Sequence, residues 1–346
     1  MKVPTHSLET AMPLYCGIDL HSNNHVICVI DDKDNRVFET KLDNISDLTI
    51  DVLTKYKRRL KSIAVESTYN WYWLVDALME SGFQVELVNT AKVVQYEGLK
   101  HTNDRYDAFH LAHLMRLGIL PTGHIYQKAT RGLRDLLRKR MQLVQARSAA
   151  LIRFKSMIQL HTGRTISANT IKTQKFKIPV IGDHNVQLAL QSEHQLIRAL
   201  IDQIKLLEKA ILGQLEPLTE YQLLKSIPGI GDILASTIWL EIGDINRFKS
   251  PGNFASYCRC VNSRRESNGK KKGENNRKNG NKYLAWAFIE AANFCVRRCE
   301  PAKRFCEKKT AARNNIVARK ALAHKLARAC YWVIKNREPF QIEKLF

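Results

Sequence analysis

Four carboxylates in the first third of the chain are spaced as ligands for divalent metal ions would be. Asp19 follows a short apolar run in GIDLHS, and Glu66 ends another in IAVEST. Asp104 and Asp107 lie three positions apart in TNDRYDAFHLA, a spacing that puts both side chains on one face of a helix. Converging carboxylates repel each other, and hard cations such as Mg²⁺, or alternatively Mn²⁺, offset that repulsion by binding oxygen ligands. The four acids together therefore predict a metal site.

Each acid also has an ordinary interpretation, as a turn former, a surface residue or a helix-capping residue, so only their joint arrangement supports a metal site. A mixed site that includes a histidine is less favoured, because oxygen ligands dominate Mg²⁺ sites. The nearby histidines are His21, His25, His110 and His113.

The elements that would position these acids follow the order of a ribonuclease H-like fold. Short apolar runs at residues 14–20, 25–30 and 36–42, separated by polar turns, predict an antiparallel meander of three strands. Helical and strand patterns then alternate, as in a parallel extension of the sheet. Those segments are a helix at 45–56, a strand at 63–66, a helix at 71–79, a strand at 84–88 and a helix at 104–117.

Two long helices are predicted next, at residues 130–160 and 186–215. The second has apolar residues at alternating spacings of three and four, from Ile197 to Ile211, which predicts an antiparallel hairpin or a dimerisation arm. The first is rich in Lys and Arg. These cations are Arg131, Arg134, Arg138, Lys139, Arg140, Arg147 and Arg153.

Charge is unevenly distributed along this chain of net charge +22. Residues 1–107 hold 12 Lys and Arg against 16 Asp and Glu, whereas residues 108–346 hold 43 against 17. The basic part therefore suits a nucleic-acid partner. Its strongest cluster of cations lies in the almost entirely polar segment 262–282. These cations are Arg264, Arg265, Lys270, Lys271, Lys272, Arg277, Lys278 and Lys282.

A helix-hairpin-helix pattern precedes that segment, at Ile227-Pro228-Gly229-Ile230-Gly231. Gly229 and Gly231 permit a tight turn whose amides could face a DNA phosphate, and the alternative is a helix-to-helix turn with no ligand. Further helices are predicted at 283–298 and 316–334.

The cysteines and the hydropathy pattern favour a cytoplasmic protein. The eight cysteines form no C-x-x-C pair and lie mostly in apolar segments, so we expect buried, reduced thiols rather than zinc ligands. No run of residues is long and apolar enough for a membrane span.

Taken together, these motifs in this order resemble the DEDD insertion-sequence transposases, the bridge-RNA-guided serine recombinases that include the Piv DNA invertase. The resemblance rests on GIDLHS, AVEST, TNDRYDAFHLA, SIPGIGDILASTIWLEIGDINRFKS and SNGKKKG followed by KNGNKYL. It implies an α/β plus α fold in three parts: a RuvC-like ribonuclease H domain at residues 12–125, a helical, coiled-coil-like region at 126–216, and a mainly helical transposase domain with the helix-hairpin-helix at 217–346.

The same resemblance implies roles for individual residues and for partners. The acids would bind Mg²⁺, and the family's nucleophilic serine matches Ser267, although Ser267-Asn268-Gly269 is one residue longer than the simplest Ser-Gly pattern. Ser263 is the second choice. The cations of the first long helix would contact the RNA backbone. The expected product of attack on DNA is a phosphoserine intermediate, and the expected partners are donor DNA, target DNA, a guide RNA and further copies of the chain in a homodimer or homotetramer.

Two alternatives remain open from the sequence. A Holliday-junction or structure-specific nuclease would use the same acids with water as the nucleophile. A nucleic-acid scaffold with a degenerate nuclease fold would need neither the acids nor Ser267.

Overall fold

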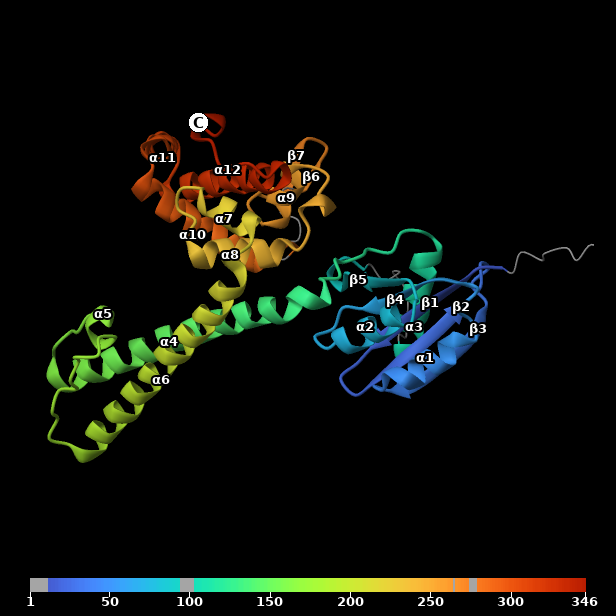
Figure 1. Ribbon diagram of the computed structural model, residues 1–346, viewed down its shortest axis with the longest axis horizontal. Coiled ribbons are helices and arrows are strands. Elements are labelled where there is room, and N and C mark those ends of the chain that lie inside the picture. Colours follow the sequence, from blue (N-terminus) through green and yellow to red (C-terminus); the bar gives the residue numbers. More distant parts are fainter. Residues whose placement is uncertain (1–11, 94–102, 264, 274–278) are drawn as a thin grey trace, which may run out of the picture. The chain divides into compact units, whose positions relative to one another are not determined.

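The computed structural model describes residues 12–93, 103–263, 265–273 and 279–346. The chain is a mixed α/β protein that divides into two compact units, Met1–Lys128 and Ala129–Phe346 (Figure 1). The predicted helical region and C-terminal domain fall almost entirely within the second unit. Among the helices of the described ranges, none is long and apolar enough to cross a membrane.

A five-stranded sheet organises the first unit, with the strand order β3-β2-β1-β4-β5. Its strands are β1 (Leu14–Leu20), β2 (Asn24–Ile30), β3 (Arg36–Asp43), β4 (Leu60–Glu66) and β5 (Val85–Val88). The first three form an antiparallel meander, and β4 and β5 run parallel to β1. The predicted order of strands is confirmed, and β1 lies at the centre of the sheet.

The two faces of the sheet carry different helices because side chains alternate along each strand. Cys16 and Ile18 of β1 belong to the apolar core that also contains residues of α1 (Ser46–Thr54) and α2 (Tyr72–Glu80). Gly17 and Asp19 point to the opposite face, which α3 covers. The candidate acid of β1 therefore shares its face with that helix.

Helix α3 (Asp104–Arg116) lies directly on strand β1 at Gly17. A Cβ atom on Gly17 would come within 2.0 Å of the Ala108 carbonyl oxygen and 2.8 Å of the Ala112 amide nitrogen. Ala108 and Ala112 are themselves fully buried. Three small residues thus allow the helix and strand backbones to approach each other closely.

Polar contacts hold α3 at both of its ends. The side chain of Asn103 accepts a hydrogen bond from the Tyr106 amide and caps the N-terminus. Near the C-terminus, Arg116 donates to Asp34 from Nε (2.6 Å), and His113 Nδ1 lies 2.9 Å from the same carboxylate. Asp34 lies in the turn between β2 and β3, so the meander fixes the position of the helix.

The Gly17 contact predicts a large loss of stability on adding a single carbon atom. Because the new Cβ would meet backbone atoms, which cannot rotate away, we expect Gly17→Ala to lower the free energy of unfolding by about 3 kcal/mol or more. Gly132→Ala is the matched control, since that helical glycine has no atom near the new Cβ and the change should stabilise by about 0.5–1 kcal/mol. Equal melting temperatures for Gly17→Ala and the native chain would contradict the proposed packing.

Two long helices form a hairpin in the second unit, α4 (Lys128–Thr162) and α6 (His184–Leu215). Phe154 of α4 packs in one core with Ile197 and Ile201 of α6 and with Ile171 of the short helix α5 (Ala168–Ile171). The predicted apolar seam of α6 therefore packs within the chain, as the hairpin alternative required.

The basic residues of α4 are largely engaged by carboxylates of the same chain. Arg140 pairs with Glu208 at 2.5 Å, and Arg153 pairs with Glu193 at 2.7 Å. Arg134 and Arg138 both reach Glu241, and Arg131 is buried. These five side chains thus have partners or are buried within the chain, and contact of this set with an RNA backbone stays a prediction. Lys139 remains exposed, and Arg147 is half-buried.

A helical bundle completes the second unit. Its helices are α7 (Thr219–Lys225), α8 (Asp232–Ile242), α9 (Pro251–Tyr257), α10 (Lys282–Arg298), α11 (Glu300–Ala312) and α12 (Asn315–Asn336). Single 3₁₀ turns lie at Thr90–Lys92 in the first unit and at Ile245–Arg247 and Ile342–Lys344 in the second. All eight cysteines are free and buried, which confirms the expected burial.

A buried carboxylate, Glu241, ties three parts of the second unit together. It is 1% exposed at the end of α8. Arg138 donates to it from Nε (2.6 Å) and Nη2 (2.9 Å), Arg134 from Nε (3.1 Å), and Asn281 from Nδ2 (2.7 Å). The Asn281 Oδ1 atom in turn caps α10 by accepting from the Tyr283 amide. Burial alone would raise the pKa of Glu241, but the Arg138 hydrogen bond and the Arg134 charge hold that pKa below its ordinary value.

Removing the charge of Glu241 should be costly, because two cations would lose their buried partner. We expect Glu241→Gln to lower the free energy of unfolding by about 3–5 kcal/mol near neutral pH. Since the folded-state pKa is lowered, this stabilisation is present above the ordinary carboxyl pKa and is lost as pH falls through the folded-state value. Urea unfolding at several pH values should therefore show the two proteins converging in acid.

The matched control is Glu300→Gln. That carboxylate is 58% exposed and pairs with Arg304 within one helix, so we expect a change of at most about 0.5 kcal/mol. A similar small change in Glu241→Gln would show that the buried network contributes little.

Candidate functional site

Strand pairing places two of the four predicted acids side by side. Strands β1 and β4 are parallel with Ile18 opposite Val65, so Asp19 and Glu66 are the next residues along each strand. Asp19 points to the face of the sheet that α3 covers. Ala64 packs against residues of α3 on that face, and Glu66, two positions after Ala64 in the same strand, points the same way. Both carboxylates therefore emerge on the same face, at the carboxyl ends of neighbouring strands.

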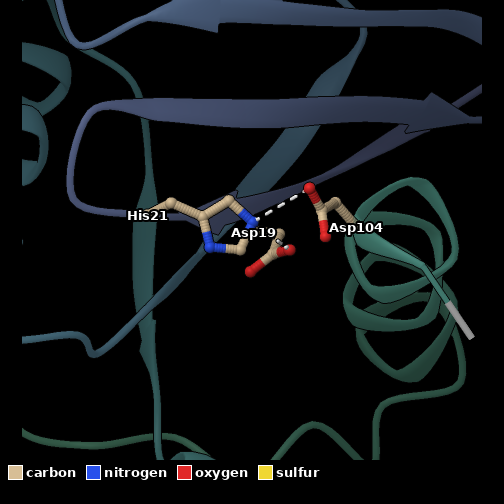
Figure 2. Close-up of side chains that lie close together, drawn as sticks. All are labelled: Asp19, His21 and Asp104. Carbon is tan, nitrogen blue, oxygen red and sulfur yellow. Dashed lines mark ion pairs between the residues drawn. The ribbon is translucent and has the colours of Figure 1, made fainter.

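Helix α3 brings its first turn to the same edge of the sheet. Because Ala108 rests on Gly17, the residues one turn earlier lie beside Asp19. His21 follows β1, and its Nε2 atom lies 3.2 Å from Asp19 Oδ2 and 3.4 Å from Asp104 Oδ2. Figure 2 shows the His21 ring directed toward both carboxylates. One ligand atom from each of Asp19, His21 and Asp104 lies within 4.8 Å of the others.

Electrostatics at Asp19 favour a neutralising partner. Its side chain is only 6% exposed. Burial, the hydrogen bond and charge of Glu66, and the charge of Asp107 raise the pKa of Asp19 from 3.8 to about 8, against the opposing effect of His21. All four predicted acids therefore contribute to one cluster, Asp104 through the His21 contact and the others through Asp19. Such crowding is what bound divalent cations relieve.

The donor atoms fit a metal ion. Among the described residues, neither Asp19 Oδ2 nor His21 Nε2 has a hydrogen-bond partner, although both atoms are buried. The two atoms face each other across 3.2 Å, and carboxylate oxygen with imidazole nitrogen is a set that divalent metals accept. A protonated His21 would instead pair with both carboxylates.

His21 is the site residue that the sequence pattern named as a possible ligand but did not favour. The available signal was its spacing, since a residue two positions after Asp19 points to the same face of an extended strand. The other nearby histidines are engaged elsewhere. His25 is buried between Asn44 and Thr49, and the His110 ring stacks on Tyr106.

Hydrogen bonds hold the backbone of His21 in place. The side-chain Nδ2 atoms of Asn44 (3.0 Å) and Asn70 (3.1 Å) both donate to the His21 carbonyl oxygen. Asn44 follows β3, and Asn70 lies in the loop after Glu66. The loop that carries His21 is thus fixed by the two neighbouring connections of the sheet.

Ser267 lies in a small β-hairpin within the polar segment 262–282, for which no strand was predicted. Strands β6 (Arg265–Ser267) and β7 (Lys270–Gly273) are antiparallel, with Ser267 opposite Lys270. Asn268 and Gly269 form the two-residue turn with φ values of 49° and 69°, the left-handed pair that Asn-Gly favours. Ser267 is exposed at the tip of the hairpin, whereas Ser263, the second choice for the nucleophile, is half-buried.

Part of the predicted basic surface around this hairpin is described. The side chains of Lys270, Lys272 and Lys282 are exposed. Arg265 and Lys271 lie in β6 and β7. Arg264, Arg277 and Lys278 lie outside the described residues.

The helix-hairpin-helix turn has a structural explanation for one of its glycines. Gly229 is buried with φ at 92°, and a Cβ there would come within 2.4 Å of the Ala291 carbonyl oxygen of α10. Packing, rather than contact with a phosphate, accounts for it. Gly231 is exposed and precedes α8, where Asp232 of the first turn pairs with Lys225 at 2.8 Å. DNA contact through Gly231 stays a prediction.

The crowded carboxylates predict a gain in stability when one of them is neutralised. In the absence of divalent ions, we expect Asp19→Asn to raise the free energy of unfolding by about 1–2 kcal/mol. The variant replaces a buried carboxylate, which Glu66 and Asp107 repel, by a neutral amide. MgCl₂ should raise the melting temperature of the native chain and have a smaller effect on the variant.

Asp51→Asn is the control for this experiment. Asp51 is exposed on α1, and its replacement should change neither the melting temperature nor the Mg²⁺ effect. If Asp19→Asn melted lower than the native chain and kept the full Mg²⁺ shift, the cluster would not be the ion site.

Comparison with protein families gives two matches, one over the acidic cluster and one over the serine hairpin. A DEDD transposase model of the IS110 type matches residues 16–162, which include the four acids and His21. The model described as transposase IS116/IS110/IS902 family matches residues 221–307, which include the serine hairpin. A search of curated proteins found no match.

Proposed function

We propose that this chain, which carries two transposase domains of the IS110 type, is a transposase that cleaves and rejoins DNA through a phosphoserine formed on Ser267. Mg²⁺, or Mn²⁺, would be held by the acids of the first domain. The observation that carries the proposal is the cluster of Asp19, Glu66, Asp107, Asp104 and His21 at one edge of the sheet.

In this proposal the acidic cluster binds ions and orients them toward a DNA phosphate. Bound divalent ions would supply positive charge that stabilises the developing negative charge on the attacking and leaving oxygens. The carboxylates and the His21 nitrogen face one another, so ligands come from β1, β4, α3 and the loop after β1. Their positions are fixed before an ion binds, because the Gly17 contact and the Asn44 and Asn70 hydrogen bonds already hold those elements.

Ser267 would supply the nucleophile. Its hydroxyl loses a proton, its Oγ forms a bond to the DNA phosphorus, and the bond from phosphorus to one sugar oxygen breaks, releasing a sugar hydroxyl. Rejoining reverses this exchange with a hydroxyl from another strand, so ester bonds are conserved and no ATP is needed. Exposure of Ser267 at the hairpin tip supports this role, since a DNA phosphate can approach it.

The partners follow from the same resemblance and from charge. The acids and Ser267 lie in different units of the chain, and we propose that a homodimer or homotetramer completes each site from two protomers. Exposed Lys270, Lys272 and Lys282 would hold donor and target DNA near the hairpin. Sequence choice would come from base pairing with a guide RNA.

A covalent adduct test separates this proposal from a nuclease that uses water. On nicked DNA carrying a recombination site, the native protein should form a phosphoserine adduct that survives denaturing electrophoresis. Ser267→Ala should form none, because no oxygen remains there to attack phosphorus, whereas Ser263→Ala, the matched control, should keep it. Cleavage at the native rate by Ser267→Ala would favour the nuclease instead.

Asp19→Asn is informative in the same assay, because it removes one proposed ion ligand without touching the hairpin. Normal recombination by this variant and by Glu66→Gln in Mg²⁺ would favour the scaffold alternative. Sequencing of RNA that co-purifies with the full chain tests the guide, and the absence of any discrete RNA would count against guiding.

A further inference from the structure

A cavity of about 480 Å³ lies between α12 and the C-terminal segment of the second unit, far along the chain from the acids and Ser267. Its size is in the range of small-molecule sites. In Figure 1 the C-terminal segment, in red, lies beside α12. Trp332 forms part of the wall and is 50% exposed, so part of its ring is open to a ligand.

Hydrogen bonds fix the C-terminal segment at both ends of this cavity. The Phe340 amide donates to Ser226 Oγ (2.9 Å), and Lys325 Nζ donates to the Leu345 carbonyl oxygen (2.5 Å). Arg337, just before the segment, pairs with Glu220 at 2.9 Å. The cavity wall is therefore built by the fold rather than by a loose terminus.

One face of α12 points polar groups into the cavity around the aromatic ring. Arg328, Trp332 and Asn336 are spaced four residues apart, so they lie on one face of the helix. Lys344 lines the opposite side. Among the described residues, the structure gives neither Arg328 nor Lys344 an ion-pair partner. Cations outnumber acids in the lining, with Lys325, Arg328 and Lys344 against Glu338.

This combination has the chemistry of a nucleotide site. An indole face stacks on a nucleobase, guanidinium and ammonium groups bind phosphate, and the Asn336 amide can hydrogen-bond a base edge. A base inside a duplex cannot present its face to Trp332, because both of its faces are covered by stacked neighbours. We propose that the cavity binds an unpaired nucleotide of a single-stranded nucleic acid, with its base on Trp332 and its phosphate near Arg328 and Lys344.

This site includes neither the metal-binding acids nor Ser267. A negative result for nucleotide binding would therefore leave the proposed recombinase chemistry untouched, and the reverse also holds. It would place one unpaired nucleotide on the second unit and thereby set the register of the bound strand. Single-stranded RNA and single-stranded DNA share the required base and phosphate, and a free nucleotide has the same groups. The experiment must therefore separate the polymer from the monomer.

The test measures the affinity of the full chain for labelled single strands of RNA and DNA about 12 nucleotides long, by fluorescence anisotropy. A duplex of the same length and uridine monophosphate as competitor are the comparison ligands. We expect Trp332→Ala to weaken binding of at least one single strand about tenfold, as loss of one stacked base does, and Trp332→Phe to retain most of it. Duplex affinity should stay within about twofold.

Two variants control for the loss of an aromatic ring and of a charge. Trp286 is 37% exposed on α10 and outside the cavity, so Trp286→Ala should leave single-strand affinity unchanged. Arg304 is an exposed cation on α11, and Arg304→Ala should weaken binding less than Arg328→Ala does. Melting temperatures of all variants should match the native value within a few degrees, since the replaced groups are exposed.

Three results would overturn the proposal. The first is that Trp332→Ala weakens the binding of single strands no more than Trp286→Ala does. The second is an equal loss for duplex, which would indicate general electrostatic binding. The third is uridine monophosphate binding as tightly as the oligonucleotides in a Trp332-dependent way, which would make a free nucleotide the ligand.

Discussion

The contact between Gly17 and helix α3 is the constraint on which the geometry of the first unit depends. With any side chain at Gly17 the helix could not rest on β1, because the Cβ would meet the backbone at Ala108. That contact sets the height and rotation of α3 over the sheet, and hence where Asp104 and Asp107 lie relative to Asp19. Gly17, Ala108 and Ala112, which carry no functional group in their side chains, thus determine whether the acids come together. The buried Glu241 network has a comparable part in the second unit, where it joins α4, α8 and the start of α10.

Much of the first unit could be predicted because its signals are local. The alternation of apolar residues and the polar turns gave the strands, and one face of the sheet had to be covered by helices. The ends of the strands then placed Asp19 and Glu66 together. What no local pattern reveals is a close approach between distant backbones, so the role of Gly17 and the direction of the His21 ring emerged only from the three-dimensional arrangement.

The second unit was harder to predict for two physical reasons. Helix α11 buries only Ala302 and Cys306 and is polar over most of its length, so its few apolar residues gave no clear helix signal. The hairpin around Ser267 has almost no apolar residue, although Asn268-Gly269 was a usable turn signal. The pairing of the α4 arginines could not be predicted for another reason. A helix rich in cations resembles a nucleic-acid surface until the acids that pair with them, Glu193, Glu208 and Glu241, are seen to lie opposite.

The length of α4 gives the Glu241 network a mechanical consequence. The helix continues from Arg138, where the network holds it, to Thr162, about 36 Å away at 1.5 Å per residue. The network at Glu241 therefore holds a helix whose far end lies well outside the bundle that contains the network. A tilt of about 10° at Glu241 would swing the far end of the helical hairpin by about 6 Å, roughly the rise of one helical turn. The contacts of Arg138 and Asn281 with Glu241 therefore determine where the far end of the hairpin lies, because the length of α4 amplifies any small change at the network.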